Sequence, residues 1–190
     1  MQRQHLVEEV KILLDLVARN TTTLADSVME IDVSEYTDPA LFEREKIELF
    51  RNYPQFAGPS CILPEPRDYF AFDDTGIPIL IVRQDDASLK AFVNICSHRG
   101  APLNECDHGK AKKGRMFSCP YHGWSYDLEG KLIGVPFGNE GFDSIDRDSL
   151  GLRTLDVQEK YGMIFVMPNP DMTFNIDEVL GGIQERLSGF

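Results

Sequence analysis

Two short runs of cysteine and histidine, 20 residues apart, constrain this chain more than any other feature of its sequence. The first run is Cys96-x-His98, and the second is Cys119-x-x-His122. Glycine follows both runs closely, and glycine adopts left-handed conformations that other residues avoid. Each loop can therefore turn tightly and direct its two side chains at one point. The pattern predicts two loops that share one metal centre.

The mixed composition of the runs indicates which metal centre they hold. An asymmetric [2Fe–2S] cluster needs two thiolates on one iron and two imidazoles on the other. We therefore expect Cys96 and Cys119 on one iron, and His98 and His122 on the other. A structural zinc site is the alternative, but zinc sites of this composition usually pair cysteine with cysteine and histidine with histidine along the chain. Neutral imidazoles raise the cluster's reduction potential from about −400 mV to between about −150 and +300 mV.

The overall composition limits the kinds of partner. Of 190 residues, 42% are hydrophobic and 26% are charged, and the formal net charge is −12. These values are ordinary for a soluble globular protein, and the negative charge disfavours binding to nucleic-acid phosphates. No apolar run approaches the roughly 20 residues that span a bilayer, and the charged N-terminus lacks the apolar core of a signal peptide. We expect a cytoplasmic protein without membrane or nucleic-acid partners, whose cysteines are metal ligands or buried thiols.

The N-terminal third has helical periodicity. Residues 5–19 repeat apolar side chains every three or four positions and predict an amphipathic helix. Residues 24–31 predict a second, shorter helical segment on the same pattern. A third helix is expected after Asp38, a good N-cap residue, because Pro39 suits the first helical position. This helix should end near residue 51.

The middle of the chain has the turn chemistry and short apolar runs of antiparallel β-structure. Runs rich in Ile, Val, Tyr and Phe are bounded by proline, glycine and aspartate at hairpin spacing. The expected strands are residues 68–72, 77–83, 89–95, 115–118, 125–127, 131–135, 152–157 and 161–167, the last two forming a closing hairpin. The predicted fold is mainly β with flanking helices, a small antiparallel sandwich or barrel that carries the two cluster-binding loops.

A last helix is expected to begin near Asn175, another N-cap residue. Its apolar face should run to residue 187, although Gly181 and Gly182 each weaken a helix by roughly 1 kcal/mol relative to alanine. The chain then divides into a helical arm (1–54), an iron–sulfur domain (55–167), and a linker with a C-terminal helix (168–190).

The two runs and their flanks resemble the signature of a known family. Asn94-x-Cys-x-His-Arg-Gly and Cys119-Pro-Tyr-His-Gly-Trp resemble the Rieske [2Fe–2S] motif. More narrowly, they are similar to the α subunits of Rieske non-haem iron aromatic-ring-hydroxylating dioxygenases. The similarity extends over about residues 35–180 and implies a Rieske-type β fold.

Two departures from the Rieske proteins of respiratory complexes bear on the cluster. Those proteins bridge the loops with a disulfide, whereas this chain has Ala101 and Tyr121 at the corresponding places. They also carry a serine hydroxyl where this chain has Trp124, which is expected to pack beside the cluster and cannot donate that hydrogen bond to a cluster sulfur. Fewer hydrogen bonds stabilise the reduced cluster less. We therefore predict a potential at the low end of the Rieske range.

The interval between the runs is slightly longer than the resemblance implies. The excess is expected in residues 104–115. Cys106, Asp107 and His108 are interpreted there as part of a solvated loop, because glycines and basic residues surround them, and not as a second metal site.

The resemblance implies electron transfer, with the oxygen chemistry elsewhere. The α subunits of that family carry a C-terminal domain whose mononuclear iron is held by two histidines and a carboxylate. Outside the two runs this chain has only His5 and His108. We expect no oxygenase activity from this chain alone, mononuclear Fe(II) only in an absent catalytic domain, and residues 168–190 to be the start of that domain.

The implied partners follow from the same resemblance. A ferredoxin or reductase would donate electrons, and the catalytic domain of the same or a neighbouring subunit, in a trimer, would receive them. The apolar stripes of residues 6–17 and 176–187 would then be interface faces. The alternative is a stand-alone Rieske-type ferredoxin, which does not need the helices at either end.

Overall fold

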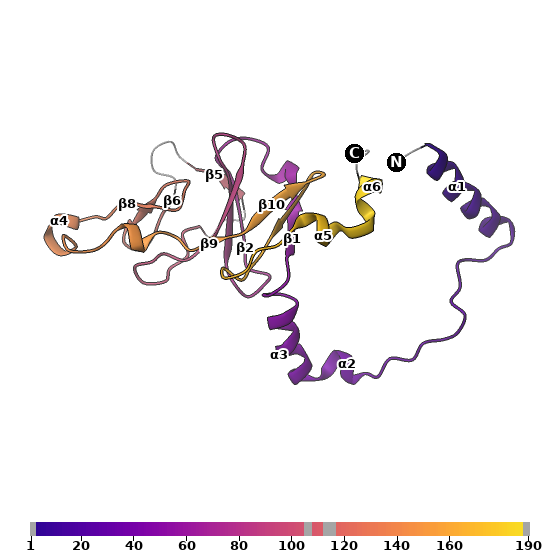
Figure 1. Cartoon of the computed structure of the whole chain (residues 1–190). Helices are drawn as coiled ribbons and strands as arrows, with labels where there is room; N and C mark the ends of the chain where they lie inside the picture. The colour runs from indigo at the N-terminus through magenta and orange to yellow at the C-terminus, as the bar shows by residue number, and fades with distance from the viewer. Residues whose placement is uncertain (1–2, 105–107, 112–116, 188–190) are drawn as a thin grey trace.

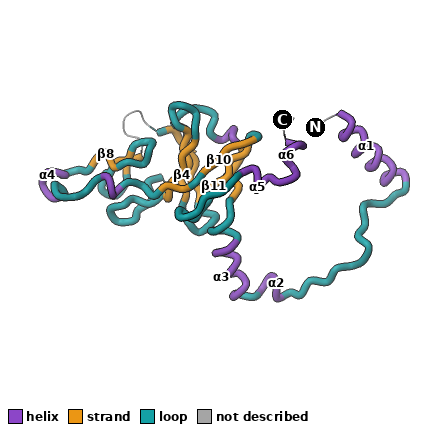
Figure 2. Tube along the Cα trace, in the orientation of Figure 1, coloured by secondary structure: helices purple, strands orange, loops and turns teal. Residues whose placement is uncertain are grey.

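The computed structural model describes the chain except residues 1–2, 105–107, 112–116 and 188–190. Strands form one compact body, and helices lie at its margins and beyond it (Figures 1 and 2). The helices are α1 (Arg3–Ala18), α2 (Ser34–Thr37), α3 (Pro39–Glu48), α4 (Gly138–Gly141), α5 (Ile176–Leu180) and α6 (Gln184–Leu187). The strands are β1 (Gln55–Pro59), β2 (Asp68–Phe72), β3 (Ile79–Arg83), β4 (Leu89–Val93), β5 (His108–Lys110), β6 (Phe117–Ser118), β7 (Ser125–Tyr126), β8 (Leu132–Gly134), β9 (Thr154–Leu155), β10 (Val157–Lys160) and β11 (Met163–Val166). The predicted mainly β fold with flanking helices is confirmed.

Strand β3 is the centre of the fold. All five of its residues are buried, four apolar residues and Arg83, and a continuous apolar run is expected of a strand that lies between two layers. It pairs antiparallel with β2 and β4 in a five-stranded sheet of order β5-β2-β3-β4-β9. Because side chains alternate along a strand, Ile79 and Ile81 enter one core, and Leu80 and Val82 enter another.

The first of these cores joins two sheets as a sandwich. The second sheet has the order β1-β11-β10, and its Ile164 and Val166 pack with Ile79 and Ile81 of β3. An ion pair also crosses between the sheets, because the Arg83 guanidinium donates two hydrogen bonds, of 2.5 and 2.8 Å, to the carboxylate of Glu159 on β10.

The second core supports the metal-binding end of the molecule. A small sheet of order β6-β7-β8 lies at the end of the body from which α4 projects (Figure 1). Its Phe117, Tyr126 and Leu132 pack with Leu80 and Val82 on the other face of β3. The five-stranded sheet therefore has apolar cores on both faces, one holding the sandwich together and the other holding the small sheet.

Three expectations for the strands are corrected. The closing hairpin forms, but its first strand is β10 and not residues 152–157, because the chain changes sheet at residue 156: β9 pairs with β4, and β10 pairs with β11. Strand β1, which pairs with β11, was not expected, because it contains Gly58 and Pro59, and glycine and proline are uncommon in strands. Residues 108–110, expected in a solvated loop, form the edge strand β5 against β2.

The N-terminal helices are confirmed only in part. Helix α1 forms, and Asp38 caps α3 by accepting a 2.8 Å hydrogen bond from the amide of Ala40. The helical segment expected over residues 24–31 is wrong, since these residues have no helix and α2 begins only at Ser34. The apolar side chains of Leu24, Val28 and Ile31 are exposed. Helix α1 has no buried residue and lies apart from the sheets (Figure 1).

The C-terminal helix begins where it was expected and then breaks. Asn175 accepts a 2.9 Å hydrogen bond from the amide of Asp177 and caps α5. A 3-10 turn at Gly181–Ile183 separates α5 from α6. Ile176 and Leu180 are buried, so this half of the stripe packs within the chain and is not the open interface face that was expected. Among the described helices, none is both long and apolar enough to cross a membrane.

Candidate metal centre

The two predicted ligand loops share one backbone design. In the first, the amide of Cys96 donates to the carbonyl of Ala101 at 2.8 Å, and the amide of Gly100 donates to the carbonyl of Cys96 at 2.9 Å. In the second, Cys119 bonds to Trp124 and Gly123 to Cys119 at the same two distances. In both loops, therefore, the backbone of the cysteine is hydrogen-bonded to the residues four and five positions after it.

The glycines of both loops have the backbone conformation that the sequence predicted. Gly100 has φ = 73° and Gly123 has φ = 74°, a left-handed region that costs residues with a Cβ about 1 kcal/mol or more. A Cβ at Gly123 would also lie 3.1 Å from Cγ of Pro136. The second glycine thus permits both the turn and the close approach of the segment after β8.

The first loop is held shut by Asn94, a buried residue at the end of β4. Its Oδ1 accepts a 3.1 Å hydrogen bond from the amide of Leu103, and its Nδ2 donates a 2.9 Å bond to the carbonyl of Asn104. Sequence reasoning included Asn94 in the motif without giving it a role. The side-chain amide of a buried asparagine needs partners for both its donor and its acceptor, and this requirement could have indicated that Asn94 binds the backbone of the loop.

The two cysteines lie in the core below the loops. Cys96 is 1% exposed and Cys119 is 4% exposed. Burial raises the pKa of the Cys96 thiol, and the neighbouring Cys119 thiol raises it further, although hydrogen bonds from Tyr126 and the amide of His98 oppose this. Metal binding removes the proton of a cysteine ligand, so a metal would give the buried Cys96 sulfur a favourable partner in its ionised form.

The rings of the two histidines lie together. The ring centroids of His98 and His122 are 4.7 Å apart, at an interplanar angle of 70°. Nδ1 of His98 is buried without a hydrogen-bond partner. Burial, then His122 and Arg99, lower the pKa of His98, which favours the neutral imidazole that binds metals. An orphaned buried nitrogen is costly unless it has a ligand, and a metal supplies one.

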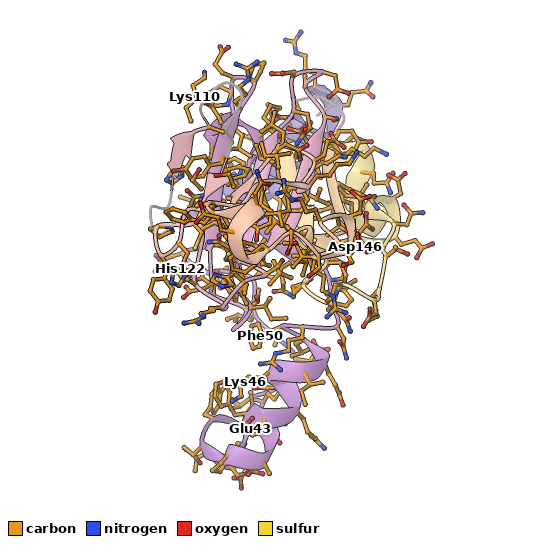
Figure 3. The ribbon with its side chains drawn as sticks, turned by 90° about the vertical axis from the view of Figure 1, so that its left-hand side faces the viewer. Glu43, Lys46, Phe50, Lys110, His122 and Asp146 are labelled. Atoms are coloured by element: carbon orange, nitrogen blue, oxygen red, sulfur yellow. The ribbon has the colours of Figure 1, made fainter. Side chains whose placement is uncertain are left out.

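The surroundings of the two histidines differ. His98 stacks on Trp124 at 4.7 Å and 10°, and Trp124 is buried, as expected of a residue packed beside the centre. His122 is exposed, with the exposed Tyr121 ring 3.7 Å away. In Figure 3, which views the molecule from the α4 end, His122 lies at the margin of the body.

Tyr126 is a functional residue that sequence reasoning missed. It is fully buried, and its hydroxyl lies 3.3 Å from Sγ of Cys96 and accepts a 3.0 Å hydrogen bond from the amide of Ser97. Burial, and then the bond to Cys96, raise its pKa to about 12, so the phenol stays protonated at neutral pH. A tyrosine in a core strand needs a partner for its hydroxyl, and that signal could have identified it.

The remaining candidates are placed elsewhere. His108 is on β5, with its ring 4.9 Å from Phe70, and His5 is exposed on α1. Cys61 is exposed, whereas Cys106 and Asp107 lie outside the described residues. Within the described parts of the chain, no three His, Cys, Asp or Glu residues are arranged to hold a single metal ion.

The donor set fits a dinuclear centre. Two buried thiols and two imidazoles, one of them with a buried nitrogen that has no partner, come in pairs from two matching loops. This is the composition of a cluster with thiolates on one iron and imidazoles on the other.

Comparison with known proteins identifies the family. The Rieske [2Fe-2S] domain family matches residues 54–154, more than half of the chain. The α subunit of benzene 1,2-dioxygenase from Pseudomonas putida is 35% identical over 144 residues, which are 76% of this chain and 31% of that protein. The α subunit of biphenyl 2,3-dioxygenase from Rhodococcus jostii is 32% identical over 151 residues, 80% of this chain and 32% of that protein.

A solved structure agrees with this assignment. The quaternary ammonium Rieske monooxygenase CntA superposes with a TM-score of 0.77 at 30% identity, over 86% of this chain and 44% of that chain. The present chain thus spans about a third of the length of the two dioxygenase subunits. The chain belongs to the Rieske [2Fe-2S] domain family, and it is homologous to the N-terminal Rieske region of the α subunits of Rieske oxygenases.

Proposed function

We propose that this chain is the electron-transfer domain of an aromatic-ring-hydroxylating dioxygenase α subunit. The arrangement of Cys96, Cys119, His98 and His122 in two matching loops carries the proposal. The two thiols would hold one iron and the two imidazoles the other. The bound cluster supplies one-electron oxidation and reduction. The proposal includes residues 1–54 as a helical arm, 55–167 as the Rieske domain, and 168–190 as the link to a catalytic domain.

The chain's own residues give the centre its working environment. Buried Cys96 and Cys119 keep one side of it out of water, while exposed His122 is the ligand that a partner protein can approach. Electron transfer needs such an approach. The proposed donor is a ferredoxin or reductase, and the proposed acceptor is a mononuclear iron in a catalytic domain of the same or a neighbouring subunit of a trimer, in the cytoplasm.

The choice of dioxygenase rests on the benzene and biphenyl dioxygenase subunits, at 35% and 32% identity. The similarity to CntA makes a monooxygenase the competing assignment. Incorporation of labelled molecular oxygen distinguishes the two in a protein that contains this chain and a catalytic domain. Both oxygen atoms enter the product of a dioxygenase, and one enters the product of a monooxygenase.

The cluster assignment is tested on this chain alone. The purified protein should contain iron and acid-labile sulfide and should absorb visible light. Cys96→Ser or His122→Ala should abolish that absorption, whereas Cys61→Ser and Cys106→Ser, as matched controls, should leave it intact. Colourless protein with one zinc ion per chain would contradict the assignment, and loss of colour in Cys106→Ser would show that the ligand set is wrong.

A further inference from the structure

The segment of residues 135–151, outside both ligand loops, is attached to each of them. At one end, Pro136 packs on Gly123, with Cγ 3.1 Å from the place where a Cβ would lie. At the other end, the carbonyl of Gly151 accepts a 3.1 Å hydrogen bond from the hydroxyl of Ser97. The segment therefore spans from the second loop to the first, across the histidine side of the centre.

The segment has internal order that fixes its middle. The amide of Phe142 donates a 3.1 Å hydrogen bond to the carbonyl of Gly138, and the Arg147 guanidinium lies 2.8 Å from the place where a Cβ on Gly138 would be. Phe142 and Ile145 both pack against the core that holds the two cysteines. Phe142 is thus directed inwards from a short, closed turn that includes α4.

The ring of Phe142 completes an aromatic enclosure around His98. It meets the His98 ring edge to face at 5.8 Å and 89°, and the Trp124 ring at 5.7 Å and 85°. His98 itself lies flat on Trp124. The imidazole is therefore stacked on an indole face, and the phenyl ring lies beside the stacked pair, in contact with both rings. Among the described residues, the ring neighbours of His122 are His98 and the exposed Tyr121, so His122 is more open than His98.

We propose that Phe142 is a positioning residue for the cluster: its ring packs beside the stacked His98 and Trp124 rings, fixes the orientation of the imidazole and excludes water from that side of the centre. The proposal rests on the proposed ligand set. With two thiolates, two neutral imidazoles and two sulfides, the oxidised cluster is neutral, and one electron from a ferredoxin or reductase makes it an anion. An apolar, dry environment disfavours the charged form. Phe142 therefore lowers the reduction potential.

The test uses the cluster-loaded chain and four variants: Phe142→Ala, Phe142→Leu, Phe142→Tyr and Ile145→Ala. Ile145→Ala is the matched control, because it also shortens an apolar side chain of the same segment that packs on the same core. The measurements are iron and sulfide content, the thermal unfolding midpoint, the reduction potential and the electron paramagnetic resonance spectrum of the reduced cluster.

Phe142→Ala is expected to raise the equilibrium constant for reduction by up to about tenfold, which is about 59 mV for a one-electron couple, and to change the resonance spectrum. Phe142→Tyr should keep the wild-type potential, and the potential of Phe142→Leu should lie between those of wild type and Phe142→Ala. Ile145→Ala should lower the unfolding midpoint and leave the potential unchanged. A purely structural role would lower the midpoint in both alanine variants without moving the potential.

Three results overturn the proposal. The first is a wild-type potential and spectrum in Phe142→Ala. The second is an equal potential shift in Ile145→Ala. The third applies if Phe142→Ala does not fold: it is an equal reduction potential in Phe142→Leu and Phe142→Tyr. Failure of the ligand set itself is recognised separately, because wild-type protein would then lack iron and sulfide, or His98→Ala would keep the wild-type spectrum.

Discussion

Replacing Tyr126 by phenylalanine should lower the reduction potential of the centre. The hydroxyl of Tyr126 lies 3.3 Å from Sγ of Cys96 and already accepts a hydrogen bond from the amide of Ser97. A metal-bound thiolate has no proton, so in the loaded protein the tyrosine must be the donor to sulfur. The sulfur gains negative charge on reduction, and the hydrogen bond therefore stabilises the reduced state more than the oxidised state.

The size of the effect follows from ordinary hydrogen-bond energies. A hydrogen bond to a charged group contributes about 1.5–3 kcal/mol. If about a third to a half of that differs between the two oxidation states, the difference is about 0.5–1.5 kcal/mol. Because 59 mV corresponds to about 1.4 kcal/mol for one electron, Tyr126→Phe should lower the potential by about 20–65 mV. Loss of the acceptor for Ser97 should also cost about 1 kcal/mol of stability.

The assay is a spectroelectrochemical titration of the visible absorption, with Tyr121→Phe as the control. Tyr121 is 61% exposed, and its ring lies beside His122. Removing its hydroxyl is the same chemical change near a proposed ligand but not at the Cys96 sulfur. Its potential should therefore equal that of wild type. An unchanged or higher potential in Tyr126→Phe, or an equal decrease in Tyr121→Phe, would refute the reasoning.

Three further predictions concern the potential and the stability of the fold. The wild-type potential should lie at the low end of the Rieske range, and a titration midpoint well above about 0 mV would contradict this. Glu159→Gln should destabilise the protein by about 1–2 kcal/mol in urea unfolding, because it weakens the pair with Arg83 between the sheets. The hydrogen bond from Arg83 lowers the pKa of Glu159. The stabilisation by this pair is therefore present above the unfolded pKa of about 4.3 and is lost as pH falls through the folded pKa. If wild type and Glu159→Gln lose stability equally on acidification, the pair does not contribute in this way. Gly130→Ala should lower the free energy of unfolding by about 2–4 kcal/mol, because φ is 79° and a Cβ would lie 2.5 Å from the Phe92 ring. The control Gly162→Ala, with φ of 72° and no atom within 4 Å of a Cβ, should lower it by about 1 kcal/mol. Equal losses of stability would show that the contact with Phe92 relaxes.

The pairing of the proposed ligands in two tight loops could be predicted from the sequence because it is local. Each loop brings one cysteine and one histidine within a few residues, and a glycine at φ near 73° closes each turn. Local chain geometry therefore determines each half of the site. The central strand was also predictable, since four consecutive apolar residues precede Arg83 in it and all five residues are buried.

The environment of the centre could not be predicted in the same way. Tyr126 and Phe142 follow Cys96 by 30 and 46 residues in the sequence, and the fold brings Tyr126 to its sulfur and Phe142 to the ring of His98. Similarly, the change of sheet at residue 156 depends on which neighbour, β4 or β11, the chain meets on each side of that residue. The periodicity of the strands does not contain that information.

The sequence by itself predicted the donor set, which stays a proposal, and it determined the two tight turns and the class of fold, because these depend on residue type and short spacing. Only the tertiary structure decided which imidazole is enclosed and which is open. His98 is stacked on Trp124 with Phe142 beside the pair, whereas His122 is at the surface. The physical reason is that burial and hydrogen bonding around a ligand come from segments distant in sequence, which meet only when the small sheet packs on the far face of β3.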